Sequence, residues 1–144
     1  YRGCTITLSD VKNDLTKLDD FVSQFSLREL ADFTVCNGSC WGLGKSGAAG
    51  KLASSKRLGV PTLYMSDGNC CVNLNRPTTG FPSSNLLAGT FNKSLEYKVG
   101  KALADESKEN GFSINLGPGG NLHRNILCGR HPEYYSEDPI LKGT

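Results

Sequence analysis

The stretch PTLYMSDG, residues 61–68, is the short apolar run that decides the fold of this chain. It has no polar alternation, begins with a proline and ends in Asp67 and a glycine, which favours a buried strand that terminates on a carboxylate. Apolar residues then recur at helical spacing over residues 92–110. Asn92 is a suitable N-cap and Gly111 is placed to end the helix.

A second strand is predicted directly after this helix, where Phe112, Ile114 and Leu116 alternate with polar residues. Strand, long helix and strand together favour a parallel pair joined by a right-handed crossover, which is an α/β fold. In such folds the working residues collect where strands end at their carboxyl side. We therefore expect Asp67 and the polar loop 117–139 to face the same side of the sheet.

The rest of the chain supplies shorter elements. Ser26 and Glu29 form a capping-box pattern that predicts the start of a helix, and together with the helical spacing before it this indicates a helical hairpin. The expected segments are an extended lead-in or interdomain join at 1–14, helices at 18–25 and 26–35, a glycine-rich loop at 37–50, a short helix at 51–59 and a loop at 75–84.

Composition excludes several function classes. The chain has 144 residues, 38% of them hydrophobic and 21% charged, with a net charge of +2, as expected of one soluble domain. Lysines and arginines are scattered among the acids, so no nucleic-acid partner is expected. No run of about 18 apolar residues occurs, and the N-terminus lacks a signal-peptide layout, so we expect no membrane partner and a cytoplasmic location.

The six cysteines are expected to be free thiols. The adjacent pair Cys70 and Cys71 would bridge only with strain, and no export signal points to an oxidising compartment. Cys36 and Cys40 resemble half a zinc site, but no second pair stands at ligand spacing. We therefore expect no metal and no cofactor.

Two functions compete for the polar strand ends. Gly42, Gly44 and Gly47 match the G-x-G-x-x-G pattern of dinucleotide-binding proteins, although CNGSCW before the first glycine is not the hydrophobic strand that this fingerprint needs. The alternative is a sugar site, in which Asp67 binds hydroxyls through charge-assisted hydrogen bonds. Further candidates for a sugar site are Arg124 and Arg130, with Trp41, Tyr134 and Tyr135 as ring platforms.

A purely structural role of these polar residues stays open as an alternative to the dinucleotide site and the sugar site. Arg130, Glu133, Glu137 and Asp138 are able to form a salt-bridged loop, and Asp67 with its glycine is able to form a simple turn.

Three stretches carry a resemblance to a known family: KRLGVPTLYMSDG, TGFPSSNLLAGTFNKSLEYKVGKALADESKENG and LGPGGNLHRNILCGRHPEYYSEDPILKG. In order and spacing they closely resemble the N-terminal part of the (β/α)8 barrel domain of family 3 glycoside hydrolases, the β-glucosidase family. The similarity covers residues 15–144. It implies about the first three units of a TIM barrel, preceded by the helical hairpin, whereas a complete barrel takes about 250 residues.

The resemblance implies a retaining, exo-acting β-glucosidase mechanism with two carboxylates about 5 Å apart. Asp67 and Arg130 match family residues that bind the sugar in the subsite of the cleaved residue, and Arg124 belongs to the neighbouring N-x-x-R stretch. The family's nucleophile and acid/base are expected outside this chain, so the chain alone should be inactive. The matching loop supports are Asn121, Glu133, Glu137 and Asp138.

The chain also departs from the family near this site. Asn69 to Asn73 stand where the family commonly has Pro-x-Gly-Val-Arg, and His131-Pro132 replaces Asn-Phe. The expected partners are a β-glucoside or related oligosaccharide and the remaining barrel and second domain of a parent protein. The alternatives are a non-catalytic remnant or sugar-binding module and, third, a nucleotide-binding domain.

Overall fold

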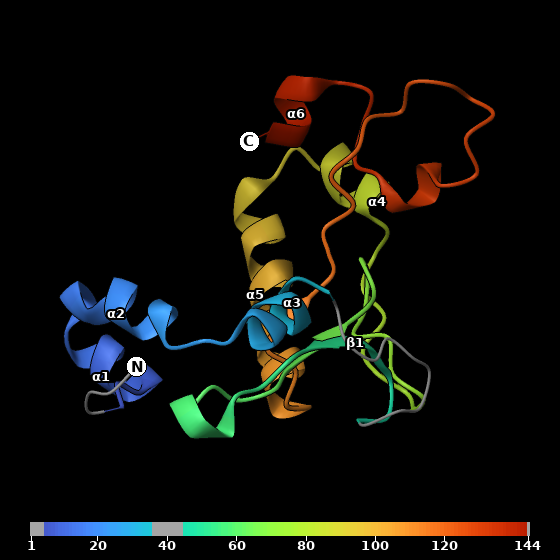
Figure 1. The fold of residues 1–144 in the computed structure, drawn as a ribbon. Helices are drawn as coiled ribbons and strands as arrows, with labels where there is room; N and C mark the ends of the chain where they lie inside the picture. Colours follow the sequence, from blue (N-terminus) through green and yellow to red (C-terminus); the bar gives the residue numbers. More distant parts are fainter. Residues whose placement is uncertain (1–4, 36–44, 144) are drawn as a thin grey trace.

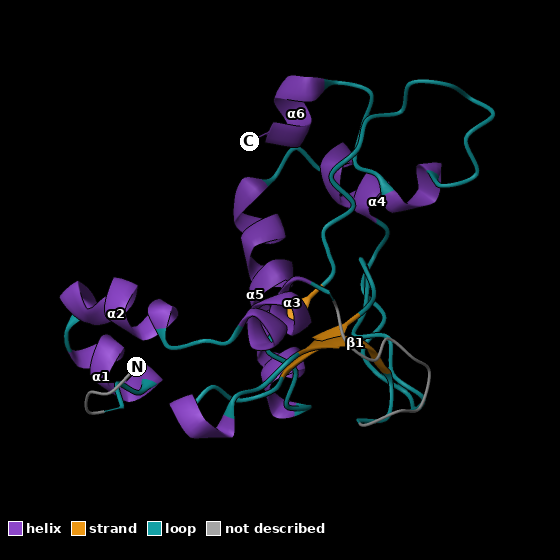
Figure 2. Ribbon diagram, in the orientation of Figure 1, coloured by secondary structure: helices purple, strands orange, loops and turns teal. Residues whose placement is uncertain are grey.

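A computed structural model describes residues 5–35 and 45–143 of the chain. In this part, short helices precede a small mixed sheet, and one long helix connects two of its strands (Figures 1 and 2). None of the helices described is both long and apolar enough to cross a membrane. The elements are α1 (Leu8–Asn13), η1 (Leu15–Lys17), α2 (Leu18–Ser23), α3 (Leu27–Thr34), β1 (Ala48–Leu52), η2 (Lys56–Leu58), β2 (Leu63–Ser66), α4 (Ser84–Gly89), α5 (Lys93–Glu109), β3 (Ile114–Asn115), η3 (His131–Glu133) and α6 (Pro139–Gly143).

The predicted strand, helix and strand unit is confirmed. Helix α5 begins after Asn92, whose side chain accepts a hydrogen bond from the Leu95 amide, and Gly111 follows its end with φ +69°. Strands β2 and β3 pair in parallel, with Met65 opposite Ile114. A long crossover helix is the usual connection between such strands.

The sheet has the order β1-β2-β3, and β1 is antiparallel to β2. Strand β1 lies at the end of the glycine-rich segment predicted to be a loop, and it also takes two residues from the predicted helix 51–59. That helix is reduced to the single turn η2, which ends as predicted at Gly59 with φ +70°. The sheet is mixed because β1 pairs with β2 antiparallel, whereas β3 pairs with β2 in parallel.

Two predictions for the N-terminal part were wrong. Residues 8–13 form helix α1 instead of an extended segment, because Thr7 and Asp10 make a reciprocal capping box. Helices α2 and α3 both form close to their predicted bounds, but α2 packs against α1. In Figure 1 the chain passes from α2 to α3 through an extended link, so these two helices do not make the expected hairpin.

A small core holds the N-terminal helices to the turn before β2. Val11, Phe21 and Leu58 are buried together. Phe21 also meets the ring of Phe25 edge-on, with centroids 5.3 Å apart. Burying each such side chain contributes roughly 1.5–3 kcal/mol, so this cluster stabilises the attachment of α1 and α2.

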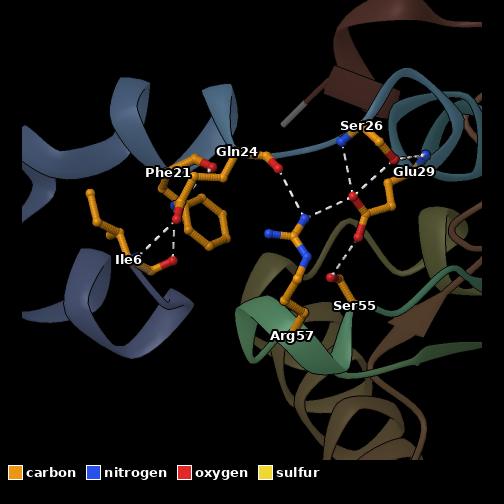
Figure 3. A network of polar contacts seen from close by, with 7 residues as sticks. All are labelled: Ile6, Phe21, Gln24, Ser26, Glu29, Ser55 and Arg57. Carbon is orange, nitrogen blue, oxygen red and sulfur yellow. Dashed lines mark hydrogen bonds and ion pairs between the residues drawn. The ribbon is translucent and has the colours of Figure 1, made fainter. Parts of the chain in front are cut away.

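Polar contacts surround this core (Figure 3). The Gln24 side chain accepts a hydrogen bond from the Ile6 amide at 2.9 Å and donates to the Ile6 carbonyl at 3.0 Å. Because Gln24 is buried, these bonds satisfy polar atoms that would otherwise be costly to remove from water. They fix the segment before α1 against the end of α2.

Candidate functional site

The carboxyl ends of β2 and β3 lie at the same edge of the sheet. Ser66, the last residue of β2, is fully buried and lies opposite Asn115 in the parallel register. The Leu116 amide donates to the Ser66 carbonyl at 2.8 Å, which continues the pairing past the end of β3. The prediction that the two polar loops start on the same side of the sheet is therefore confirmed.

The two loops also touch each other at a glycine. A β-carbon on Gly119 would lie 2.2 Å from the Glu133 carbonyl oxygen and 3.0 Å from Nδ2 of Asn69. Gly119 also forms a parallel bridge with Tyr134. Only a residue without a side chain fits between these segments. Through this contact the loop that carries Asp67 and the turn that carries Arg130 share one support.

Asp67 is exposed and keeps acceptor capacity for a ligand. Its Oδ1 accepts a hydrogen bond from the Gly68 amide at 2.9 Å, and its carbonyl accepts one from the Asn73 amide at 2.8 Å. The side chain lines a small cavity of about 50 Å³ beside Ala49 and Asn75. An ionised carboxylate has about four acceptor positions, so Asp67 is able to receive hydrogen bonds from sugar hydroxyls as well.

Arg130 is held by a neighbour on the same turn. Its Nε lies 3.1 Å from Oε1 of Glu133, and its Nη2 lies 2.9 Å from Oε2. This ion pair raises the pKa of the Arg130 guanidinium. The side chain of Arg130 is 71% exposed, which leaves further N–H groups accessible to solvent. The structural reading of a salt-bridged loop therefore holds for this pair of residues.

The other candidate residues lie on the same loop in different roles. Oδ1 of Asn121 accepts from the Leu122 amide at 2.9 Å, and Oδ1 of Asp138 accepts from the Ile140 amide at 2.8 Å. Both side chains thus fix local turns. Arg124 and Glu137 are exposed, and Arg124 forms no ion pair within the described part of the chain. The structure does not join Asp67, Arg124 and Arg130 by direct hydrogen bonds among the described residues.

A histidine pair closes this loop, and sequence reasoning missed it. The rings of His123 and His131 stack with centroids 4.6 Å apart, and Nε2 of His123 lies 3.0 Å from the His131 carbonyl oxygen. Tyr134 packs beside both rings and is only 8% exposed. Tyr134 is therefore a packing residue, and its proposed role as a sugar platform is wrong. The only sequence signal was the presence of two histidines on one loop.

Tyr135 lines a larger groove between α5 and the segment after β3. The groove has a volume of about 790 Å³, and its walls include Leu103, Val99 and Pro118. Burial is the main cause that raises the pKa of the Tyr135 hydroxyl. A mostly apolar groove of this size is suited to packing against another protein segment or to binding the face of a sugar ring.

The hypothesis of a dinucleotide-binding site does not agree with the structure. Gly42 and Gly44 lie outside the described residues, as do Trp41, Cys36 and Cys40. Gly47 is described and leads directly into strand β1. The fingerprint requires a helix after its last glycine, whose N-terminus binds the pyrophosphate. This segment therefore lacks the element that would bind a dinucleotide.

The chain is similar in sequence and in structure to several known proteins. The chain is 39% identical over 145 residues to a β-glucosidase of Ruminococcus albus, covering 96% of this chain and 15% of that protein. It is similar in structure to β-glucosidase 3B of Thermotoga neapolitana in complex with α-D-glucose, with a TM-score of 0.82, 38% identity and coverage of 88% and 20%. A Bifidobacterium adolescentis GH3 β-glucosidase gives a TM-score of 0.71 at 33% identity, covering 85% of this chain and 17% of the other. No protein-family profile matches the chain.

The proteins that the chain resembles are glycoside hydrolases. More particularly, the matches cover most of this chain and support a β-glucosidase-like fragment of glycoside hydrolase family 3. The chain spans about 15% of the length of the curated relatives that it matches first. The resemblance seen in the sequence is thereby confirmed over most of the chain.

Proposed function

We propose that this chain forms part of a retaining, exo-acting β-glucosidase-like hydrolase and supplies one wall of the subsite that holds the cleaved sugar. Asp67 binds sugar hydroxyls, and Arg130 binds the same sugar from the neighbouring loop. The observation that supports the proposal is the close approach of Gly119 to Asn69 and Glu133, which stand two residues after Asp67 and three residues after Arg130. The similar Thermotoga neapolitana enzyme was solved with glucose.

The nucleophile and the acid/base of this mechanism come from outside the 144 residues. A retaining glycosidase needs two carboxyl groups about 5 Å apart on either side of the scissile bond. Asp67 is assigned to binding, and Glu133 is engaged by Arg130. The chain alone should therefore leave p-nitrophenyl β-glucoside intact, and measurable hydrolysis would contradict this division of roles.

The remaining barrel and second domain of the parent protein are the proposed protein partners. Strand β3 is an edge strand of the sheet in the described part of the chain, and a parallel neighbour would satisfy its free backbone groups. The apolar groove beside α5 offers a packing surface next to this edge. These features support further parallel strands beside β3, as the proposed barrel of about three units within this chain requires. The cytoplasmic location stays a prediction.

The experiment that tests the proposal is a glucose titration of the chain followed by ¹H–¹⁵N NMR. We expect shifts of the amides around Asp67 and Arg130, and their loss in Asp67→Asn and in Arg130→Gln. Asp20→Asn and Arg28→Gln are matched controls, because these two residues are exposed on helices α2 and α3, away from the two loops in sequence. Shifts that survive Asp67→Asn and Arg130→Gln would show that the sugar binds elsewhere.

A further inference from the structure

Two basic side chains line a cavity that the glycoside hydrolase site does not use. The cavity has a volume of about 250 Å³ and lies where residues 45–46, residues 74–76 and the end of α5 come together. Its polar lining is Lys45, Ser46, Asn75, Arg76 and Asn110. The lining contains no carboxylate, so the charge inside it is positive.

Lys45 is held in this cavity by aromatic rings. Its Nζ lies 4.7 Å from the centroid of the Phe112 ring and 5.7 Å from that of Tyr64. Both distances lie within the range of a cation–π contact. Lys45 forms no ion pair with any carboxylate of the described residues. The preceding stretch 36–44, CNGSCWGLG, contains no Asp or Glu that could supply one.

Arg76, the second cation of this cavity, is oriented by Asn110. It donates a hydrogen bond to Oδ1 of Asn110, and Nδ2 of Asn110 in turn donates to the Glu106 carbonyl at 2.7 Å. The Glu106 carboxylate is engaged elsewhere, because its Oε1 accepts from the Thr79 amide at 3.0 Å. Arg76 likewise has no ion pair among the described residues.

Two cations beside one cavity repel each other, and an anion bound between them offsets this repulsion. A guanidinium fork binds carboxylate or phosphate oxygens in pairs, and an ammonium group adds a point charge. The Ser46 hydroxyl and the Asn75 amide, 3.5 Å apart, offer further hydrogen bonds. We propose that this cavity binds a small oxyanion, a phosphate or a carboxylate group, between Lys45 and Arg76.

The site is independent of the sugar site in its chemistry, although Asn75 lines both cavities. Asp67 carries a negative charge and accepts hydrogen bonds, whereas Lys45 and Arg76 only donate them. Substitution of Asp67 should therefore leave oxyanion binding in place. This separation allows the two proposals to fail independently.

The test is a titration of the whole chain with inorganic phosphate at low ionic strength, followed by ¹H–¹⁵N NMR. We expect saturable shifts of the Ser46 and Gly111 amides. Lys45→Met keeps an unbranched side chain over Phe112 but loses the charge, and Arg76→Gln loses the fork; each should weaken binding at least about tenfold. Lys98→Gln is the matched control, because it removes one exposed charge from α5 outside the cavity.

A parallel titration with acetate distinguishes the two oxyanions. Tighter phosphate binding would identify a phosphate group as the ligand, and tighter acetate binding would identify a carboxylate. Arg76→Lys is the second variant if Arg76→Gln does not fold by circular dichroism; it keeps the charge and should still weaken binding several-fold. Absence of saturable shifts with both anions, or equal weakening by Lys98→Gln, would overturn the proposal.

Discussion

The Arg57 guanidinium lies 2.9 Å from Oε2 of Glu29 and also donates to the Gln24 carbonyl at 2.9 Å (Figure 3). One side chain thus ties the end of α2 and the start of α3 to the turn before β2. Glu29 accepts three further hydrogen bonds, from the Ser26 amide at 2.9 Å, from the Ser26 hydroxyl at 3.0 Å and from the Ser55 hydroxyl at 3.0 Å. These contacts make Glu29 the centre of the attachment between the N-terminal helices and the sheet.

This network predicts a pH-dependent stability. The Ser26 amide is the largest cause that lowers the pKa of Glu29, and with Ser55 and Arg57 it brings the pKa from 4.5 to about 2. A carboxyl whose pKa is lowered by folding stabilises the protein above its unfolded pKa, and this contribution is lost as the pH falls towards the folded pKa. Glu29→Gln should therefore lower the Tm at pH 7, and its difference from the wild type should shrink between pH 4.5 and 2.

Circular dichroism melts across this pH range provide the measurement. Glu109→Gln is the control, because Glu109 is exposed at the end of α5. A Tm difference for Glu29→Gln that is the same at pH 2 and pH 7 would show that the charge of Glu29 is not what matters.

How far the sequence predicts this fold depends on the range of the interactions. Helix α5 was predictable because its N-cap Asn92, its apolar face and Gly111 are all local signals. Helix α1 was missed although the capping-box pair of Thr7 and Asp10 is also local. Strand β1, with sequence AAGKL, has little strand preference of its own and forms by pairing with β2, which no local pattern indicates.

The site divides in the same way. The pair of Arg130 and Glu133 lies three residues apart, so the sequence indicated it. The contact of Gly119 with Glu133 and Asn69 depends on how two loops pack. The pairing of Arg57 with Glu29 spans 28 residues, and no periodicity predicts such a partner. The sequence therefore predicted which residues lie at the strand ends but not the contacts that position them.

Gly68 should be intolerant of a side chain. Its φ is +119°, and a β-carbon there would lie 2.3 Å from the Cys71 carbonyl oxygen. Gly68→Ala should cost about 1–3 kcal/mol of unfolding free energy from backbone strain alone. Gly100 in α5 has open space around the equivalent position, so Gly100→Ala should stabilise the chain by about 0.5–1 kcal/mol. Urea unfolding of both variants measures this contrast, and effects of the same sign would contradict it.

Cys128 should react with iodoacetamide faster than Cys71. Burial is the main cause that raises the pKa of the Cys71 thiol above 9.0, and the neighbouring Cys70 adds to it. Cys128 is exposed. Because the thiolate is the reactive form, Cys128 should be alkylated well before Cys71 at pH 8. Peptide mass spectrometry over time gives both rates, and equal rates would count against the burial of Cys71.

Glu133 should matter for sugar binding more than for stability. Its ion pair with Arg130 is exposed to solvent, and such pairs contribute little to folding. Glu133→Gln should therefore leave the Tm almost unchanged. The same change releases the Arg130 side chain, so glucose binding should weaken several-fold because Arg130 must be ordered again on binding. Weakened binding together with a large fall in Tm would instead indicate that Glu133 supports the loop itself.

The open edge of the sheet should make the isolated chain associate. Strand β3 is an edge strand among the described residues, and Leu116 directly after it is 48% exposed. Unpaired strand edges with apolar neighbours favour pairing with another chain. Leu116→Lys should reduce association in size-exclusion chromatography with light scattering. Leu15→Lys changes another exposed leucine, far from this edge in sequence, and should not. A monodisperse monomer would show that the edge is satisfied within the chain.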